Sequence, residues 1–230
     1  MNDLKLTGHD LVGDGLYLLR FECPPSLLQQ YSTPGQYAII RTSPEQERPA
    51  FFAIASSPSD TYVELLIKQS PGSAEHLIGM KKEQTVECQA IQGPGFSLDC
   101  SASSPDIHMF SMGSGYAPFR ALIRSIAESK ERCKLHLWQA AFRLSSVPLL
   151  DEMVAFEKDG LISLHLCLDE QTEDTALPFF SGQVQQALEN FGEDLKDSRL
   201  LWIGSHAFVE SLKAALQSIG VDPDRLVTNY

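Results

Sequence analysis

Cysteine is sparse in this sequence and scattered along it. Only five of the 230 residues are cysteines, and none of them forms a C-x-x-C pair. This spacing argues against a structural zinc site, an iron–sulfur cluster and a disulfide framework. The histidines are isolated as well, and His136 and His165 stand in apolar, strand-like runs that favour packed or solvent-facing roles over metal binding. We therefore expect no metal centre.

Positive charge is also scarce. The chain has 18 lysines and arginines against 30 aspartates and glutamates, a formal net charge of −12. A nucleic-acid or anionic-membrane surface is therefore not expected, although a local basic pocket stays open. The first residues contain no apolar signal core, and no apolar run reaches membrane-spanning length. We expect a cytoplasmic protein without a nucleic-acid or membrane partner.

Short strands separated by glycine and proline fill the first hundred residues. The clearest lie at residues 16–22, 36–41, 50–56, 62–68 and 85–91. Their regular spacing predicts an antiparallel β-barrel. A short helix near residues 73–79 follows Pro71-Gly72, with Ser73 as its candidate N-cap. Small residues before a helix can cradle an anion, and the alternative is a plain capped helix.

After the polar link at residues 101–106, strands and helices alternate. Strands are expected at residues 107–112, 134–140, 162–168, 200–203 and 225–228, and helices at 118–129, 148–158, 182–190 and 207–219. This alternation predicts a five-stranded parallel sheet covered on both faces. We therefore expect an all-β plus α/β fold, with a barrel domain at residues 1–100 and a parallel α/β domain at 101–230. Ligands of such sheets bind beyond the carboxyl ends of the strands.

One stretch, residues 107–123, organises the second half. An apolar strand runs into Gly113-Ser114-Gly115, and a helix then begins at Pro118. The N-terminus of a helix carries roughly half a positive charge and free N–H groups, so a phosphate is its natural ligand. The full G-x-G-x-x-G fingerprint is absent, because Pro118 stands in the place of the third glycine. An ordinary strand-to-helix turn without a ligand is the alternative.

A barrel followed by a nucleotide domain resembles the ferredoxin–NADP reductase family, and several segments carry this resemblance in order along the chain. The glycine turn and the residues after it resemble the family's GTGIAPFRS loop. The chain is most similar to the short two-domain branch called "fruit protein"-like, which has a comparable apolar FxAIAS strand. The matching segments are Pro34-Gly35-Gln36-Tyr37, Phe52–Pro58, Gly72-Ser73-Ala74, Gly93-Pro94-Gly95, Gly113–Arg120, Trp202-Ile203-Gly204 and Asn229-Tyr230.

The resemblance implies FAD as a cofactor and NADH or NADPH as a substrate. It also implies a role for Tyr230, whose ring would cover the flavin at the catalytic centre. The residues implied for FAD are Arg48, Phe52, Ala53, Ile54, Ala55, Ser56, Ile67, Gly72, Ser73 and Ala74. Those implied for the nicotinamide nucleotide are Gly113, Ser114, Gly115, Tyr116, Ala117, Pro118, Gln139, Arg143, Gly204 and Ser205.

Departures from the family pattern leave two functions open. In the family's R-x-Y-S frame, Ala50 replaces arginine and Ala53 replaces serine, and one lost charge-assisted hydrogen bond costs about 1.5–3 kcal/mol. Ile203 also stands where many members have a cysteine. The first hypothesis is an FAD-dependent NAD(P)H oxidoreductase with an unidentified electron acceptor, a protein being one candidate. The alternative is a catalytically degenerate protein of the same fold that binds flavin or nucleotide and acts through a partner.

Overall fold

The chain divides into two compact units that are not contiguous in sequence. The structure, a computed structural model, describes residues 3–43, 45–98, 100, 104–129, 133–170, 177–189 and 192–229, without the side chains of residues 192 and 193. The first unit comprises Met1–Leu98, Tyr116–Ser129 and Asn229–Tyr230, and the second comprises Asp99–Gly115 and Lys130–Thr228. The helix that follows the glycine turn therefore groups with the first unit. The domain boundary at residue 100 stays a prediction.

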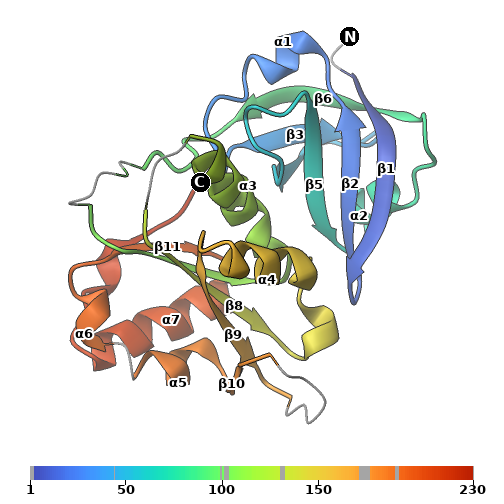
Figure 1. Ribbon diagram of the computed structural model, residues 1–230. Helices are drawn as coiled ribbons and strands as arrows, with labels where there is room; N and C mark the ends of the chain where they lie inside the picture. Colours follow the sequence, from blue (N-terminus) through green and yellow to red (C-terminus); the bar gives the residue numbers. More distant parts are fainter. Residues whose placement is uncertain are drawn as a thin grey trace. The chain divides into compact units, whose positions relative to one another are not determined.

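The first unit is built on a six-stranded antiparallel sheet in the order β4-β3-β6-β1-β2-β5 (Figure 1). Its edge strands β4 and β5 meet through the isolated bridge between Ile54 and Leu65 and through the Ala55 N–H, which donates to the Glu64 carbonyl at 2.8 Å. The sheet is therefore barrel-like without being closed, which confirms the predicted architecture. Its strands are β1 (Asp3–Gly13), β2 (Leu16–Glu22), β3 (Tyr37–Arg41), β4 (Ala50–Ala53), β5 (Tyr62–Lys68) and β6 (Thr85–Gln92).

Strand β1 was not predicted, although it is the longest of the sheet. Leu4 and Leu6 alternate into the core, but the second half of the strand is mostly exposed or half-buried. That half is held by its pairing with β2, from His9 opposite Leu19 onward, rather than by burial. The apolar alternation therefore fades along the strand. A helical turn, α1 (Pro25–Leu28), was also missed.

Two helices complete the first unit, α2 (Ser73–Ile78) and α3 (Tyr116–Ser129). The prediction that Ser73 caps α2 is wrong. Gly72 is the N-cap, at φ 89°, and Ser73 is the first helical residue. Its hydroxyl instead accepts a hydrogen bond from Gln46 Nε2 at 3.0 Å. Helix α3 begins two residues before Pro118, which still lies in the first turn, where its missing N–H leaves no helical bond unmade.

The second unit is a parallel sheet in the order β10-β9-β8-β7-β11-β12. It has six strands where five were predicted, because β10 pairs only two residues with β9 and is too short for a sequence pattern. Phe110, Trp138, Phe208 and Leu212 belong to the core that packs this sheet against α5 and α7. The elements are β7 (Ile107–Met112), β8 (Leu135–Ala141), α4 (Leu150–Lys158), β9 (Ser163–Leu168), β10 (Phe180–Ser181), α5 (Val184–Leu188), α6 (Gly192–Leu195), β11 (Arg199–Ile203), α7 (His206–Ser218) and β12 (Leu226–Val227).

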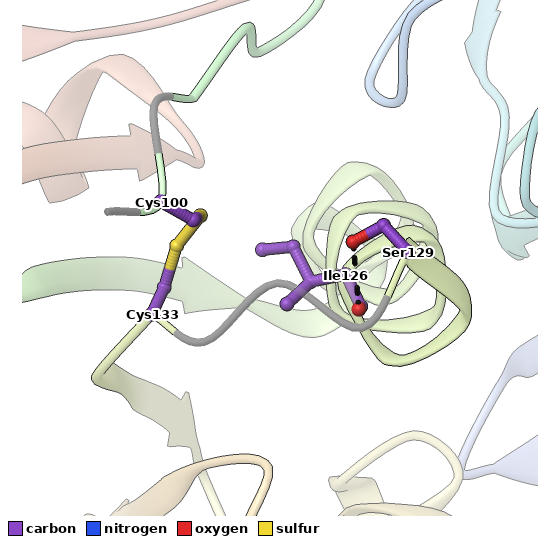
Figure 2. The surroundings of a disulfide bond; sticks show 4 residues. All are labelled: Cys100, Ile126, Ser129 and Cys133. Atoms are coloured by element: carbon purple, nitrogen blue, oxygen red, sulfur yellow. Dashed lines mark hydrogen bonds between the residues drawn. A yellow bond between two sulfur atoms is a disulfide. The ribbon is translucent and has the colours of Figure 1, made fainter. Parts of the chain in front are cut away.

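A disulfide joins Cys100 to Cys133, so the expectation that the cysteines form no disulfide framework is wrong at this pair (Figure 2). Their Cα atoms lie 5.0 Å apart although 33 positions separate them in sequence. The two residues precede the adjacent parallel strands β7 and β8. Strand pairing brings them together, and sequence spacing carries no sign of it. Cys23, Cys88 and Cys167 are buried and free.

Within the described ranges, no helix combines the length and apolar character needed to cross a membrane.

Candidate cofactor and nucleotide sites

Strand β4 offers an open edge in the first unit. It pairs with β3 on one side, with Phe51 opposite Ile39 and Ala53 opposite Tyr37. Phe51 is 62% exposed, and its ring packs edge-on against Tyr37 with centroids 5.5 Å apart. Phe52 is half-buried and packs against the barrel core. An edge strand with free backbone groups and exposed aromatic surface fits the rim of a flat heterocycle.

The start of α2 supplies a second open backbone segment in the same unit. A Cβ built on Gly72 would meet no atom within 4 Å, so the backbone is accessible there. The first N–H groups of a helix have no partner within the helix, so those of Ser73 and Ala74 can donate to a phosphate. These features fit the diphosphate of FAD.

The remaining residues implied for FAD lie in three different surroundings. Arg48 is exposed in the segment before β4. Ile67 is 2% exposed and belongs to the barrel core. Ser56 is completely buried, and its Oγ accepts a hydrogen bond from the Glu64 N–H at 3.0 Å. The side chains of Ile67 and Ser56 are therefore closed to a ligand, whereas Phe52 and Ala53 are half-buried and accessible.

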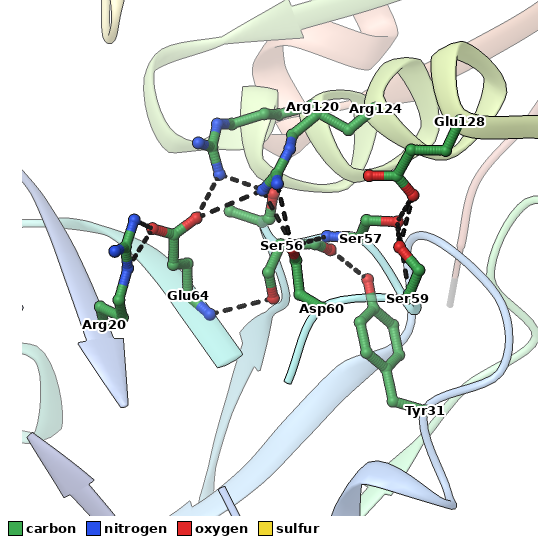
Figure 3. A network of polar contacts seen from close by, with 11 residues as sticks. Arg20, Tyr31, Ser56, Ser57, Ser59, Asp60, Glu64, Arg120, Arg124 and Glu128 are labelled. Atoms are coloured by element: carbon green, nitrogen blue, oxygen red, sulfur yellow. Dashed lines mark hydrogen bonds and ion pairs between the residues drawn. The ribbon is translucent and has the colours of Figure 1, made fainter. Parts of the chain in front are cut away.

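A buried polar network follows strand β4, and the sequence analysis missed it (Figure 3). Glu64 of β5 is 1% exposed, and its Oε2 accepts a 2.7 Å bond from Arg120 Nη1. Arg20 donates to the other carboxylate oxygen from Nε at 2.9 Å and from Nη2 at 2.7 Å. Burial alone would raise the pKa of Glu64, but Arg120 and Arg20 outweigh it and hold that pKa below its ordinary value. A charge inside the apolar runs YVELLIK and PFRALI was the available signal.

In the second unit, a pocket of about 290 Å³ opens at the carboxyl ends of the parallel strands. Burial raises the pKa of Cys167 to about 12, so a neutral thiol faces this pocket. Its lining includes Met112 after β7, Ala140, Ala141 and Phe142 at the end of β8, Cys167 and Asp169 around the end of β9, and Ser205 and Phe208 around the start of α7. The ends of β7, β8 and β9 and the start of α7 thus converge on this pocket.

Not every predicted residue of these strand ends lines the pocket. Ser205 does, and it also caps α7, because its Oγ accepts from the Phe208 N–H at 3.2 Å. Gln139 is completely buried and accepts a 2.6 Å hydrogen bond from the Ser111 hydroxyl, which braces β7 against β8. Arg143 is exposed and follows the lining segment by one residue.

Different physical constraints explain the glycines at positions 113, 115 and 204. Gly113 has φ 53°, and a Cβ there would meet no atom within 4 Å. At Gly115 a Cβ would lie 2.6 Å from the Ile203 carbonyl oxygen, so close packing alone requires glycine. A Cβ on Gly204 would likewise lie 2.6 Å from the ring of Phe208. Gly113 is therefore the position of the three that leaves room for a ligand.

The remaining residues of the GTGIAPFRS-like loop are Ser114, which is half-buried, and Tyr116, Ala117 and Pro118, which are buried. These three residues pack in the protein interior, so the part of the loop that is accessible to a ligand is Gly113–Gly115.

The end of the chain returns to the first unit. Asn229 is 3% exposed, and its Nδ2 donates to the Gly35 carbonyl at 2.5 Å. Gly35 belongs to the Pro34–Tyr37 segment that carries the family resemblance. Tyr230 lies outside the described residues, so its role over the flavin remains a prediction.

Comparison with known proteins shows which fold this is. No protein-family model matches the chain. The toluate 1,2-dioxygenase electron transfer component of Pseudomonas putida is 23% identical over 199 residues, covering 86% of this chain and 58% of the relative. The chain thus spans little more than half the length of that protein.

Solved structures agree on the fold. The Amycolatopsis cytochrome P450 reductase GcoB superposes with a TM-score of 0.80 at 17% identity, over 99% of this chain and 69% of its own. The ferredoxin–NADP+ reductase of Plasmodium falciparum gives 0.80 at 14% identity, over 98% of this chain and 94% of its own. The chain therefore has the fold of the ferredoxin–NADP reductase-like reductases, as the sequence resemblance implied.

Proposed function

We propose that this protein is an FAD-dependent NAD(P)H oxidoreductase. One observation carries the proposal. A chain of reductase-like fold has, in its first unit, an open β4 edge and an accessible backbone at Gly72 and, in its second unit, a pocket at the carboxyl ends of the parallel strands. FAD, when bound, would exchange hydride with nicotinamide, while the protein supplies binding and orientation.

The proposed FAD segment is Phe52–Ser56, in which Phe52 and Ala53 are accessible, together with the N–H groups of Ser73 and Ala74. Arg48, which is exposed, is the candidate to replace the family arginine whose position Ala50 occupies. Ala53 cannot supply the family's serine hydroxyl, so we expect weaker FAD binding than in a member that keeps both groups. The loss of one such bond corresponds to roughly tenfold to a hundredfold in affinity.

We further propose NADH rather than NADPH as the preferred electron donor. The Asp169 carboxylate lines the pocket of the second unit. Among the residues that the structure describes, the pocket lining contains no lysine or arginine. A carboxylate accepts hydrogen bonds from a ribose 2′-hydroxyl and repels a 2′-phosphate.

A protein is the proposed electron acceptor. The curated relative is named an electron transfer component of a dioxygenase, and one structural neighbour is a cytochrome P450 reductase. The competing function, a degenerate flavin- or nucleotide-binding protein, is favoured by Ala53 and Ile203, which stand where the family has serine and, in many members, cysteine.

A visible spectrum of the purified protein, recorded before and after anaerobic addition of NADH, separates these functions. Bound flavin that is bleached by NADH supports the oxidoreductase. Flavin that stays oxidised with NADH and also with NADPH supports the degenerate protein, and absence of flavin after incubation with FAD would exclude the flavin-dependent reaction.

The assigned FAD segment has its own test. Ser73→Pro removes one N–H but is compatible with the first helical position, whereas Ser73→Ala removes the hydroxyl and keeps the N–H. We expect FAD retention to fall in the proline variant and to change little in the alanine variant. Equal retention in both variants and the parent would exclude this segment as the diphosphate site.

A further inference from the structure

The backbone after β4 lies in a buried cluster of charges, all within the first unit. Arg120 of α3 is 5% exposed, and a single nitrogen, Nη1, donates both to Glu64 Oε2 at 2.7 Å and to the Ala55 carbonyl at 2.9 Å. Figure 3 shows Arg120 and Arg20 approaching Glu64 from different elements. Arg120 of α3 therefore links Glu64 of β5 to the segment after β4, and Arg20 of β2 binds the same carboxylate.

Stability alone does not explain such a buried cluster of charges. A buried ion pair gains little over apolar residues of similar volume, because removing both charges from water offsets their attraction. Ala55 also sits where regular pairing stops, since β4 ends at Ala53 and one isolated bridge follows at Ile54. From Ala55 on, side chains supply part of the hydrogen bonding of the backbone.

Both ends of the segment Ala55–Ser56 are held by hydrogen bonds. The Ala55 N–H donates to the Glu64 carbonyl at 2.8 Å, and the Ser56 carbonyl accepts from the buried Tyr31 hydroxyl at 2.6 Å. The Ala55 carbonyl between them is held by Arg120. Arg120 thus orients the backbone group that lies in the proposed FAD segment, Phe52–Ser56.

We propose that Arg120 is a positioning residue for FAD, acting through the Ala55 carbonyl; this inference rests on the proposed function. Glu64 holds the guanidinium in place, and the guanidinium holds the strand end in its ligand-binding conformation before FAD arrives. Fixing a binding segment in advance reduces the ordering cost of binding. The sequence motif that resembles a nucleotide loop therefore ends in a residue that serves the flavin segment.

Two matched substitutions test this role. Arg120→Lys and Arg20→Lys make the same chemical change against the same carboxylate, but Arg20 holds the other oxygen of Glu64 and its side chain is about half exposed. Lysine is shorter than arginine, so at position 120 its Nζ falls short of the place that Nη1 occupies. We expect Arg120→Lys to weaken FAD binding about tenfold or more. Arg20→Lys should stay within a few-fold of the parent, as a half-exposed ion pair contributes little.

The readouts are FAD affinity by titration of the apoprotein, the visible circular dichroism of bound flavin, and amide exchange of residues 55–57 without FAD. Arg120→Lys should change the dichroism and speed that exchange, and Arg20→Lys should do neither. If Arg120→Lys does not fold, Glu64→Gln serves instead. It removes the charge that holds the Arg120 guanidinium, so FAD affinity should fall and amide exchange of residues 55–57 should become faster. Parent-like values of both would contradict the proposal.

The outcomes are distinguishable. A parent protein that binds no FAD overturns the proposed function, and the positioning role with it. A parent that binds FAD, with the two lysine variants alike in affinity, dichroism and exchange, overturns the positioning role alone.

Discussion

At the scale of single residues, His108 gives the stability of the protein a defined pH dependence. Burial, with His136 and His165 nearby, lowers the pKa of His108 to about 3. His108 binds a proton near pH 6.5 in the unfolded chain, but only near pH 3 in the folded protein. The free energy of unfolding should therefore fall as pH decreases through this window, by about 1.4 kcal/mol per pH unit for one proton.

His108→Asn tests this dependence. The histidine Nδ1 accepts a 3.0 Å hydrogen bond from Trp138 Nε1, and an asparagine oxygen can take over that bond without titrating. Urea unfolding between pH 7 and pH 4.5 should show a shallower pH slope for the variant than for the parent. Parallel slopes would contradict the prediction. Half-buried His165, whose pKa is lowered to about 4 by burial and by His136, should leave a residual slope in both proteins.

Asp169 carries the prediction on nucleotide preference. Asp169→Asn removes the charge that faces the pocket and keeps a hydrogen-bonding group of the same shape. We expect NADPH binding to improve by roughly tenfold, about the 1.4 kcal/mol that relief of one charge repulsion supplies. Titration with NADH and NADPH measures the ratio of affinities, and an unchanged ratio would place the 2′-position elsewhere. Glu170→Asn, at an exposed neighbour, is the control.

At the scale of elements, substitutions in the glycine turn can distinguish a role in packing from a role in ligand binding. Gly113→Ala should cost about 1–2 kcal/mol for its left-handed backbone and should weaken nicotinamide-nucleotide binding if a ligand approaches there. Gly115→Ala should cost more stability, because its Cβ would lie 2.6 Å from the Ile203 carbonyl oxygen. Thermal unfolding and NADH titration of both variants check this. If the Gly113→Ala variant binds nucleotide as tightly as the parent, the turn has only a structural role.

Elements with strong apolar patterns were predictable, and those held by other forces were not. Strands β2, β5 and β7 have the predicted bounds because their apolar runs are buried. Strand β4 ends three residues early, since Ser56 turns to Glu64 and the Ser57 N–H donates to Asp60. The same limit applies to the sites. Gly113 and Ser205 could be proposed from local sequence, whereas the Glu64–Arg120 pair joins positions 56 residues apart, which no local pattern reveals.

At the scale of the whole molecule, the disulfide should be a main determinant of stability. Linking Cys100 to Cys133 closes a loop of 33 positions, for which the loss of chain entropy in the unfolded state corresponds to about 3–4 kcal/mol. Cys100→Ser and Cys133→Ser should each lower the free energy of unfolding by about that amount, and the double variant by no more than either. Urea unfolding with and without reductant measures this effect. A parent unaffected by reductant would contradict it.

The grouping of α3 with the first unit has a consequence for recombination. The chain passes between the units at residues 98–99, 115–116, 129–130 and 228–229, so neither unit is one continuous stretch of gene. A gene fragment cut near residue 100 would encode Glu64 without Arg120, leaving a buried carboxylate short of a partner. Shuffling the two halves among relatives should therefore succeed only when the residue 116–129 helix travels with the barrel that it completes. The compact unit is a barrel-like sheet plus a helix distant in sequence, not the amino-terminal half.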